Sequence, residues 1–181
     1  MYGDLSGLSF AGFDLRNTRF TGSIEGCDFT DADISGADFD GHIRPEGKNK
    51  YVPGKRITRE QLYSTRSYKD KNLANVKFRF CTLSDFDFTG QCLGYFVYCD
   101  LKGAKFEDAT FSRLGGVGKS RRGPSPGFSD SCKLTFEQFA STRTFKSGRL
   151  PPNFQISDEL KKKFNEAKGV AKQTSRNSHV D

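Results

Sequence analysis

Large apolar residues recur every five positions in two stretches of this chain, and this period limits the possible folds more than any other feature. A period of five fits neither the 3.6-residue period of an α-helix nor the two-residue period of a strand. We infer a chain that turns a corner at every fifth residue and points one large side chain inward on each side. These candidate core residues are Leu5, Phe10, Leu15, Phe20, Ile24, Phe29, Ile34, Phe39, Leu73, Phe78, Leu83, Phe88, Leu93, Leu101, Phe106 and Phe111.

A smaller residue stands two positions before many of these large ones, and an aspartate often directly precedes the large one. The small positions include Cys27, Ala32, Ala37, Val76, Cys81, Cys99, Ala104 and Ala109. Four corners would close a square coil of about 20 residues, stacked on the next at about 4.8 Å, the spacing of strands. Each large residue should then stack on the fourth large residue after it, so that Phe lies on Phe and an aliphatic residue on an aliphatic one. In the irregular stretch GYFVYCD, either Phe96 or Tyr98 occupies the inward position.

The stretches CDFTDADISGADF and CDLKGAKFEDATF resemble the pentapeptide-repeat family, whose unit is A-[D/N]-[L/F]-x-x. The resemblance covers roughly residues 3–40 and 71–112, and it implies a right-handed quadrilateral β-helix. We therefore predict an all-β solenoid in two blocks, residues 1–40 and 73–112, with short helical insertions and a C-terminal helix.

A larger duplication lies between and after these blocks. Residues 57–73 (ITREQLYSTRSYKDKNL) match residues 134–150 (LTFEQFASTRTFKSGRL) at a fixed offset of 77. Both begin with a threonine and a glutamine at capping-box spacing, so each predicts a short helix. We therefore interpret segment 41–72 as a basic loop and a short helix, and we interpret segment 113–150 as its duplicate. Segment 151–181 holds a final helix from about 158 to 168, followed by a disordered tail.

The inserted loops are basic and the first repeat block is acidic. Residues 1–40 carry eight acidic and two basic side chains, whereas residues 41–72 carry nine basic and three acidic ones. The loops are either a solvated surface that balances the repeats or a patch for an anionic or acidic partner. The candidate partner-binding residues are Lys48, Lys50, Lys55, Arg56, Lys119, Arg121 and Arg122.

The segment GGVGKS raises the question of a phosphate-binding loop, because Gly118, Lys119 and Ser120 match the end of that motif. Arg113 occupies the position of its first glycine, and RRGPSPG follows where a helix should begin. We predict a solvated loop.

The cysteines fit the small inward position, and His42 has no nucleophile beside it. We expect no enzyme, no catalytic residues, no cofactor and no metal.

The function that this sequence favours is a non-enzymatic scaffold for protein–protein interaction, with a protein partner of unknown identity. A second interpretation is a secreted bacterial effector or a fragment of a larger repeat protein. The family resemblance also suggests a third function, that of a protein which mimics DNA and binds gyrase. Mimicry of DNA needs a long acidic rod, however, and the net charge of this chain is +7. Nucleic-acid binding through the loops ranks lower, because the aromatic residues are committed to the core. With no signal peptide or membrane span in the sequence, we expect a cytoplasmic protein; the oligomeric state stays open.

Overall fold

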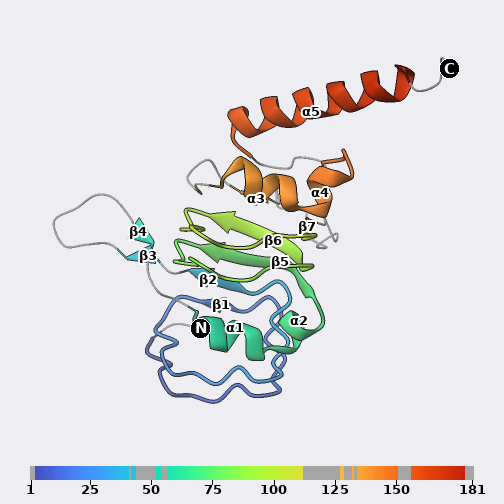
Figure 1. The fold of residues 1–181 in the computed structure, drawn as a ribbon. Coiled ribbons are helices and arrows are strands. Elements are labelled where there is room, and N and C mark those ends of the chain that lie inside the picture. The colour runs from blue at the N-terminus through green and yellow to red at the C-terminus, as the bar shows by residue number, and fades with distance from the viewer. Residues whose placement is uncertain are drawn as a thin grey trace.

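The computed structural model arranges the chain in layers stacked along one axis (Figure 1). It describes residues 3–40, 42–43, 52–53, 57–111, 127–128, 132, 134–150 and 156–177. We number the layers in chain order from the N-terminal end. They comprise residues 3–20, 21–40, 57–79, 80–97, and finally 98–111 together with 127–128.

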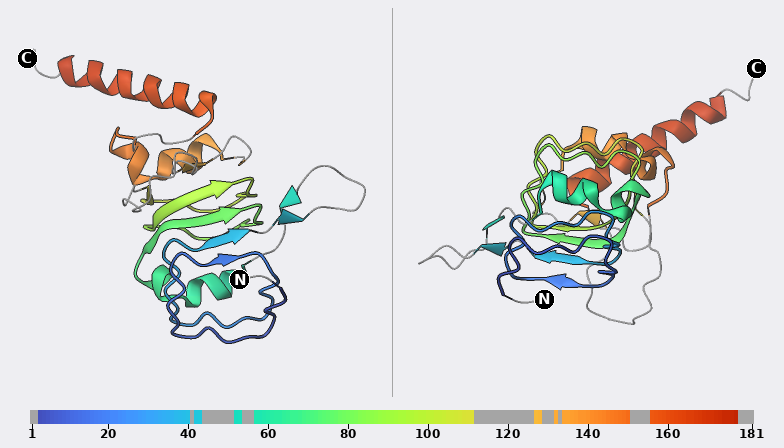
Figure 2. Two further views of the ribbon diagram at one scale, coloured as in Figure 1. Left: turned by 180° about the vertical axis from the view of Figure 1, so that it is seen from behind. Right: turned by 90° about the horizontal axis from the view of Figure 1, so that it is seen from below.

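One side of the stack is a parallel sheet with a strand from each layer, in the order β1-β2-β5-β6-β7, and β8 also pairs with β6. A short antiparallel pair, β3 and β4, lies outside it and projects to one side of the stack (Figure 2). The strands are β1 (Arg19–Phe20), β2 (Asp38–Asp40), β3 (His42–Ile43), β4 (Val52–Pro53), β5 (Asn72–Arg79), β6 (Cys92–Val97), β7 (Thr110–Phe111) and β8 (Gly127–Phe128).

Two pairs of short helices occur at the duplicated segments, and a long helix follows them. They are α1 (Arg59–Ser64), α2 (Arg66–Lys69), α3 (Phe136–Ser141), α4 (Arg143–Lys146) and α5 (Asp158–Asn177). Each pair is split by a threonine, Thr65 or Thr142, whose side chain caps the second helix. We expected one helix in each segment, but an extended threonine at this position ends the first helix and begins the second.

The prediction of an all-β solenoid with a right-handed quadrilateral β-helix is wrong. Helices α1 to α5 make up a large share of the described residues, and the main sheet is a single parallel sheet on one side of the stack, with five strands in a row and β8 beside β6. Along the other sides, the chain turns too soon for strands to form. Residues with positive φ at the corners, such as Gly12 and Asp31, leave only isolated bridges there, including Ser9 to Asp28. In addition, α1 and α2 replace two sides of the third layer.

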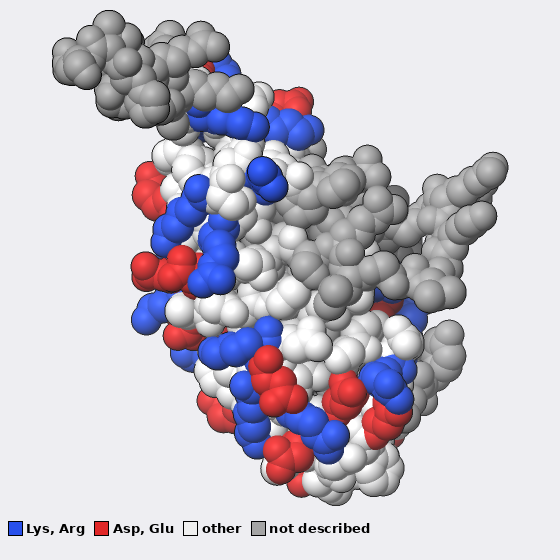
Figure 3. All heavy atoms as spheres, turned by 90° about the vertical axis from the view of Figure 1, so that its right-hand side faces the viewer, with Lys and Arg blue, Asp and Glu red and all other residues white. Residues whose placement is uncertain are grey.

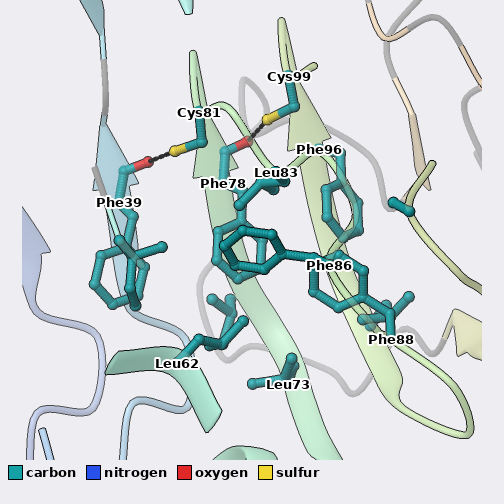
Figure 4. Packing of buried hydrophobic residues seen from close by; sticks show 14 of the residues in the cluster. Phe39, Leu62, Leu73, Phe78, Cys81, Leu83, Phe86, Phe88, Phe96 and Cys99 are labelled. Atoms are coloured by element: carbon teal, nitrogen blue, oxygen red, sulfur yellow. Dashed lines mark hydrogen bonds between the residues drawn. The ribbon is translucent and has the colours of Figure 1, made fainter. Parts of the chain in front are cut away.

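The predicted large inward residues lie in one continuous core, where all of them are buried except Leu5, which is partly buried. Stacked phenyl rings run through four layers, with centroid distances of 5.1 Å from Phe20 to Phe39, 5.9 Å from Phe39 to Phe78 and 5.4 Å from Phe78 to Phe96. Figure 4 shows the last three with their neighbours. In the irregular stretch, Phe96 points inward and Tyr98 stays 48% exposed.

The last helix is longer than the sequence indicated. We predicted an end at Gly169 and a disordered tail, but α5 continues to Asn177. A single glycine costs a helix about 1 kcal/mol relative to alanine, which is too little by itself to end α5 at Gly169. Leu160 and Phe164 of α5 are buried, with the Phe164 ring 5.4 Å from that of Phe145 in α4. In the part of the chain that the structure describes, none of the helices has the length and apolar character needed to cross a bilayer.

Candidate functional site

The duplicated helix pairs dock on two layers through the same hydrogen bonds. The side-chain amide of Gln61 donates to the carbonyl oxygens of Ile24 and Cys27 at 2.8 and 3.0 Å. Gln138 donates in the same way to Leu101 and Ala104 at 2.9 and 2.8 Å. Both glutamines also complete the capping box of their own helix. The duplication therefore includes the layer on which each helix pair rests.

The two helix pairs differ in what covers their outer side. The fourth layer covers α1 and α2, and there the Tyr63 hydroxyl accepts from the Asp87 N–H at 2.6 Å while the Tyr68 hydroxyl donates to the Asp87 carbonyl at 2.7 Å. Over α3 and α4 lies α5 instead (Figure 1). The first pair is thus an internal spacer, and the second is the end cap that a stack of layers needs.

We expect Gln61→Met to lower the free energy of unfolding by about 1–3 kcal/mol, because it leaves two buried carbonyl groups without a donor. Gln138→Met is the matched control. Gln138 is partly exposed, so water can replace its amide, and the loss should stay below about 1 kcal/mol. Urea unfolding followed by circular dichroism measures both. Equal losses at the two positions would contradict this account.

The recurring aspartates stabilise the corners. Asp14, Asp28 and Asp33 each accept a hydrogen bond from the main-chain N–H two residues later, at 3.1, 2.9 and 3.0 Å. Asp87 and Asp100 do the same in the fourth and fifth layers. This bond stabilises a turn and requires no chemistry from the carboxylate. The acidic repetition is thereby explained by the fold.

These bonds lower the pKa of the corner aspartates. The hydrogen bond from the Arg16 side chain lowers the pKa of Asp14 from 3.8 to about 2. The hydrogen bond from Thr30 also lowers the pKa of Asp28. Burial raises the pKa of Asp33, but hydrogen bonds from Ser35 outweigh it, so the net direction is again down. The folded state therefore favours the ionised form at these corners.

The protein should lose stability as the pH falls from about 4 to about 2. A depressed pKa in the folded state contributes stability that is present above the unfolded value and is lost as these carboxylates are protonated. Thermal unfolding by circular dichroism at successive pH values measures the effect. Asp14→Asn, which keeps an acceptor but cannot titrate, should flatten the fall. A melting temperature that does not change over this range would contradict the prediction.

A charged cluster that the sequence did not predict lies on the outer face of β1, β2 and β5. Arg79 contacts Asp38 at 2.9 Å and Asp40 at 3.0 Å, and Arg19 contacts Asp40 at 3.1 Å. Asp40 is only 4% exposed. These residues come from three layers, so the cluster holds the first block and the second block together.

The cysteines of the small inward position also have structural partners. The thiols of Cys27, Cys81 and Cys99 donate to the main-chain carbonyl oxygens of Leu5, Phe39 and Phe78, at 3.0, 3.5 and 3.2 Å, and Figure 4 shows the latter two. The N–H of Cys99 donates to the sulfur of Cys132 at 3.2 Å. Burial raises the pKa of Cys99 well above its ordinary value, so this thiol is not a ready nucleophile.

All seven predicted partner-binding residues, Lys48, Lys50, Lys55, Arg56, Lys119, Arg121 and Arg122, lie outside the described residues. The same holds for the whole GGVGKS segment. The structure does fix where the loops leave the layers. The first follows β2, whereas the second lies between β7 and β8, before its layer is complete. The described residues that flank the two loops therefore differ, although the helices after the loops are duplicates.

The described residues offer little that resembles a reaction centre. A shallow hollow of about 270 Å³ lies between α3 and the fifth layer, with Lys105, Glu107 and Glu137 at its edge. Within the described ranges, no group of three or more His, Cys, Asp or Glu side chains is arranged to hold a metal ion.

Charge is unevenly distributed along the stack. Residues 21–40, the second layer, carry six acidic side chains and no basic one, while residues 134–169 carry seven basic and four acidic ones. Much of the acidity is neutralised locally, since Asp31 pairs with Lys69 at 2.7 Å and Asp38 with Arg79 at 2.9 Å. Lys and Arg lie close to Asp and Glu over much of the face shown in Figure 3.

Comparison with known proteins found no match to any family model, curated protein or solved structure.

Proposed function

We propose that this chain is a pentapeptide-repeat protein that acts as a non-enzymatic scaffold for protein–protein interaction, in the cytoplasm. One observation carries the proposal: the repeated polar side chains bond to the main chain of the layers. Asp14, Gln61 and Cys99 are examples, with contacts of 3.1, 2.8 and 3.2 Å. Side chains that could do chemistry thus support a frame, and a rigid frame is what a binding scaffold requires.

The seven basic loop residues are the proposed contact with the partner. Basic loops on a layered frame favour an acidic protein surface, which they would attract and orient. The DNA-mimic alternative is less favoured, because the acidic side chains at Asp31, Asp38 and Asp40 are paired with lysine or arginine. A DNA mimic would present such charges unpaired.

The test is affinity capture of partners from the lysate of the source cell. The wild-type chain is compared with a loop variant in which the seven basic loop residues are serine. A matched control changes seven basic residues of the layers and helices to serine, so that both variants have the same net charge. The control positions, all exposed, are Arg16, Arg59, Arg66, Lys102, Lys105, Arg143 and Lys162.

We expect the wild type and the control to retain the same protein, and the loop variant to lose it. Binding should weaken as salt rises, since the contact is between exposed charges. Equal loss in both variants would indicate a general charge effect and not a loop site. A partner retained by the loop variant would place the contact elsewhere.

A further inference from the structure

The N-terminal end of the stack exposes large apolar side chains. In the first layer Leu8 and Phe13 are 49% and 56% exposed. Nineteen residues later, at the same inward position of the second layer, stand Cys27 and Ala32, which are 4% and 0% exposed. The outermost layer therefore carries leucine and phenylalanine where the layer above it carries small residues, and these large side chains are left at the open end.

Main-chain groups at this end also lack partners. In the second layer, the N–H groups of Asp28 and Asp33 donate to the carbonyl oxygens of Leu8 and Phe13 in the layer below, both at 3.0 Å. The equivalent N–H groups of the first layer belong to Ser9 and Asp14, and neither has a hydrogen-bond partner among the described residues. A row of unpaired groups beside exposed apolar side chains is a template for pairing with another chain.

The opposite end of the stack is closed. There α3, α4 and α5 cover the fifth layer, and Phe139 and Phe164 are 0% and 5% exposed. A head-to-tail stack of copies would have to displace this cap. A head-to-head contact, first layer to first layer, displaces none of the described elements.

Charge also favours a contact between two identical first layers. The first layer, residues 3–20, carries Asp4, Asp14, Arg16 and Arg19, so its formal charge is balanced. The second layer, with six acidic and no basic side chains, would repel its own copy at the same distance. The balanced layer is the one at the open end.

We propose that the protein forms a two-fold dimer in which the first layer of one copy stacks on the first layer of the other. A two-fold axis places the same surface on both sides, so each copy covers the Leu8 and Phe13 side chains of the other. The N–H groups of Ser9 and Asp14 then face main-chain carbonyl groups of the partner's first layer, where the carbonyl oxygens of Ser9 and Asp14 likewise accept no hydrogen bond from the described residues. This inference stands apart from the loop-binding proposal, because it involves neither loop.

Sedimentation equilibrium of the full chain, from low-micromolar to submillimolar concentration, tests the dimer. We expect the mass to rise with concentration to twice the 20.2 kDa of the chain. Leu8→Glu combined with Phe13→Glu should weaken dimerisation about a hundredfold or more, because it places like charges opposite each other. Thr30→Glu combined with Asn165→Glu adds the same charge at exposed positions elsewhere and should leave the dimer intact.

Hydrogen exchange provides a second reading that does not depend on the variants. The Ser9 and Asp14 amides should exchange fast when the protein is dilute and become protected as it dimerises. A chain that is monomeric at every concentration would overturn the proposal, as would a dimer that persists in the Leu8/Phe13 variant. Protection of these amides in the monomer would also overturn it, since another part of the same chain would then cover this end.

Discussion

Replacing Phe88 by alanine should lower the free energy of unfolding by about 3–5 kcal/mol, the cost of removing a buried phenyl group and leaving a cavity. Phe88 is 0% exposed, and four other phenylalanine rings surround it. Its ring stacks on that of Phe106 at 5.4 Å and meets Phe96 edge-to-face, also at 5.4 Å. The site has little room to collapse, because these rings are themselves held by the hydrogen bonds between layers.

Chemical denaturation followed by circular dichroism measures the loss, and Tyr98→Ala is the control. Tyr98 is also aromatic and stacks on Phe80 at 4.8 Å, but it is 48% exposed, so its removal should cost about 1 kcal/mol or less. The comparison separates burial in the core from aromatic stacking as such. Similar losses at the two positions would show that the core is not organised as the structure has it.

The position of Phe88 in the core could be predicted from sequence because the five-residue period directly reports which side chains point inward. The same reasoning placed Phe10 on Phe29 and Phe88 on Phe106, and the ring centroids of these pairs are 5.5 and 5.4 Å apart. A period reports only one side chain per corner, however. It does not tell whether the main chain between two corners forms a strand.

The fold class was mistaken for that reason. Strands persist on one side of the stack, and single bridges take their place at corners such as Ser9 and Asp14. The helices add to the difference. The capping boxes at Thr58 and Thr135 indicated where they begin, but the sequence did not show that α1 and α2 would take the place of two sides of the third layer.

The candidate site shows a similar division. The corner role of the aspartates follows from local sequence, since the acceptor and donor are two residues apart, as in Asp28 and Thr30. The cluster of Arg19, Asp40 and Arg79 could not be predicted, because it depends on β2 pairing with β5 across the 31 intervening residues, 41–71. The loop in this interval carries four of the seven proposed contact residues, Lys48, Lys50, Lys55 and Arg56, which lie outside the described residues.

The large inward residues Leu93 and Phe96 are three positions apart, whereas five is the usual spacing. A bulge in β5 explains this shorter spacing. Leu73 pairs with Leu93 and Lys77 with Tyr95, so three residues of β5 lie opposite the single residue Gly94. Asn75, in the bulge, has a φ of 61°. The extra main chain of β5 must pass close to β6, and it does so at the residue that has no side chain.

Gly94→Ala should therefore destabilise the protein by about 3 kcal/mol, at the upper end of the cost of overpacking. A Cβ atom at this position would lie 2.3 Å from the carbonyl oxygen and 2.8 Å from the nitrogen of Val76. Both are main-chain atoms in the central pair of the sheet, so they cannot rotate away as a side chain would. The strands would have to separate, and Phe78 and Phe96 would lose their contact.

Gly90→Ala is the control for this prediction, measured by the same denaturation experiment. Gly90 has a φ of 69° and no atom within 4 Å of an added Cβ, so its cost is the backbone strain of about 1 kcal/mol alone. A loss at Gly94 that clearly exceeds the loss at Gly90 would isolate the close approach of the two strands. If Gly94→Ala were tolerated as well as Gly90→Ala, then β5 and β6 would not meet through this bulge, and the pairing of Phe78 with Phe96 would have to be reassigned.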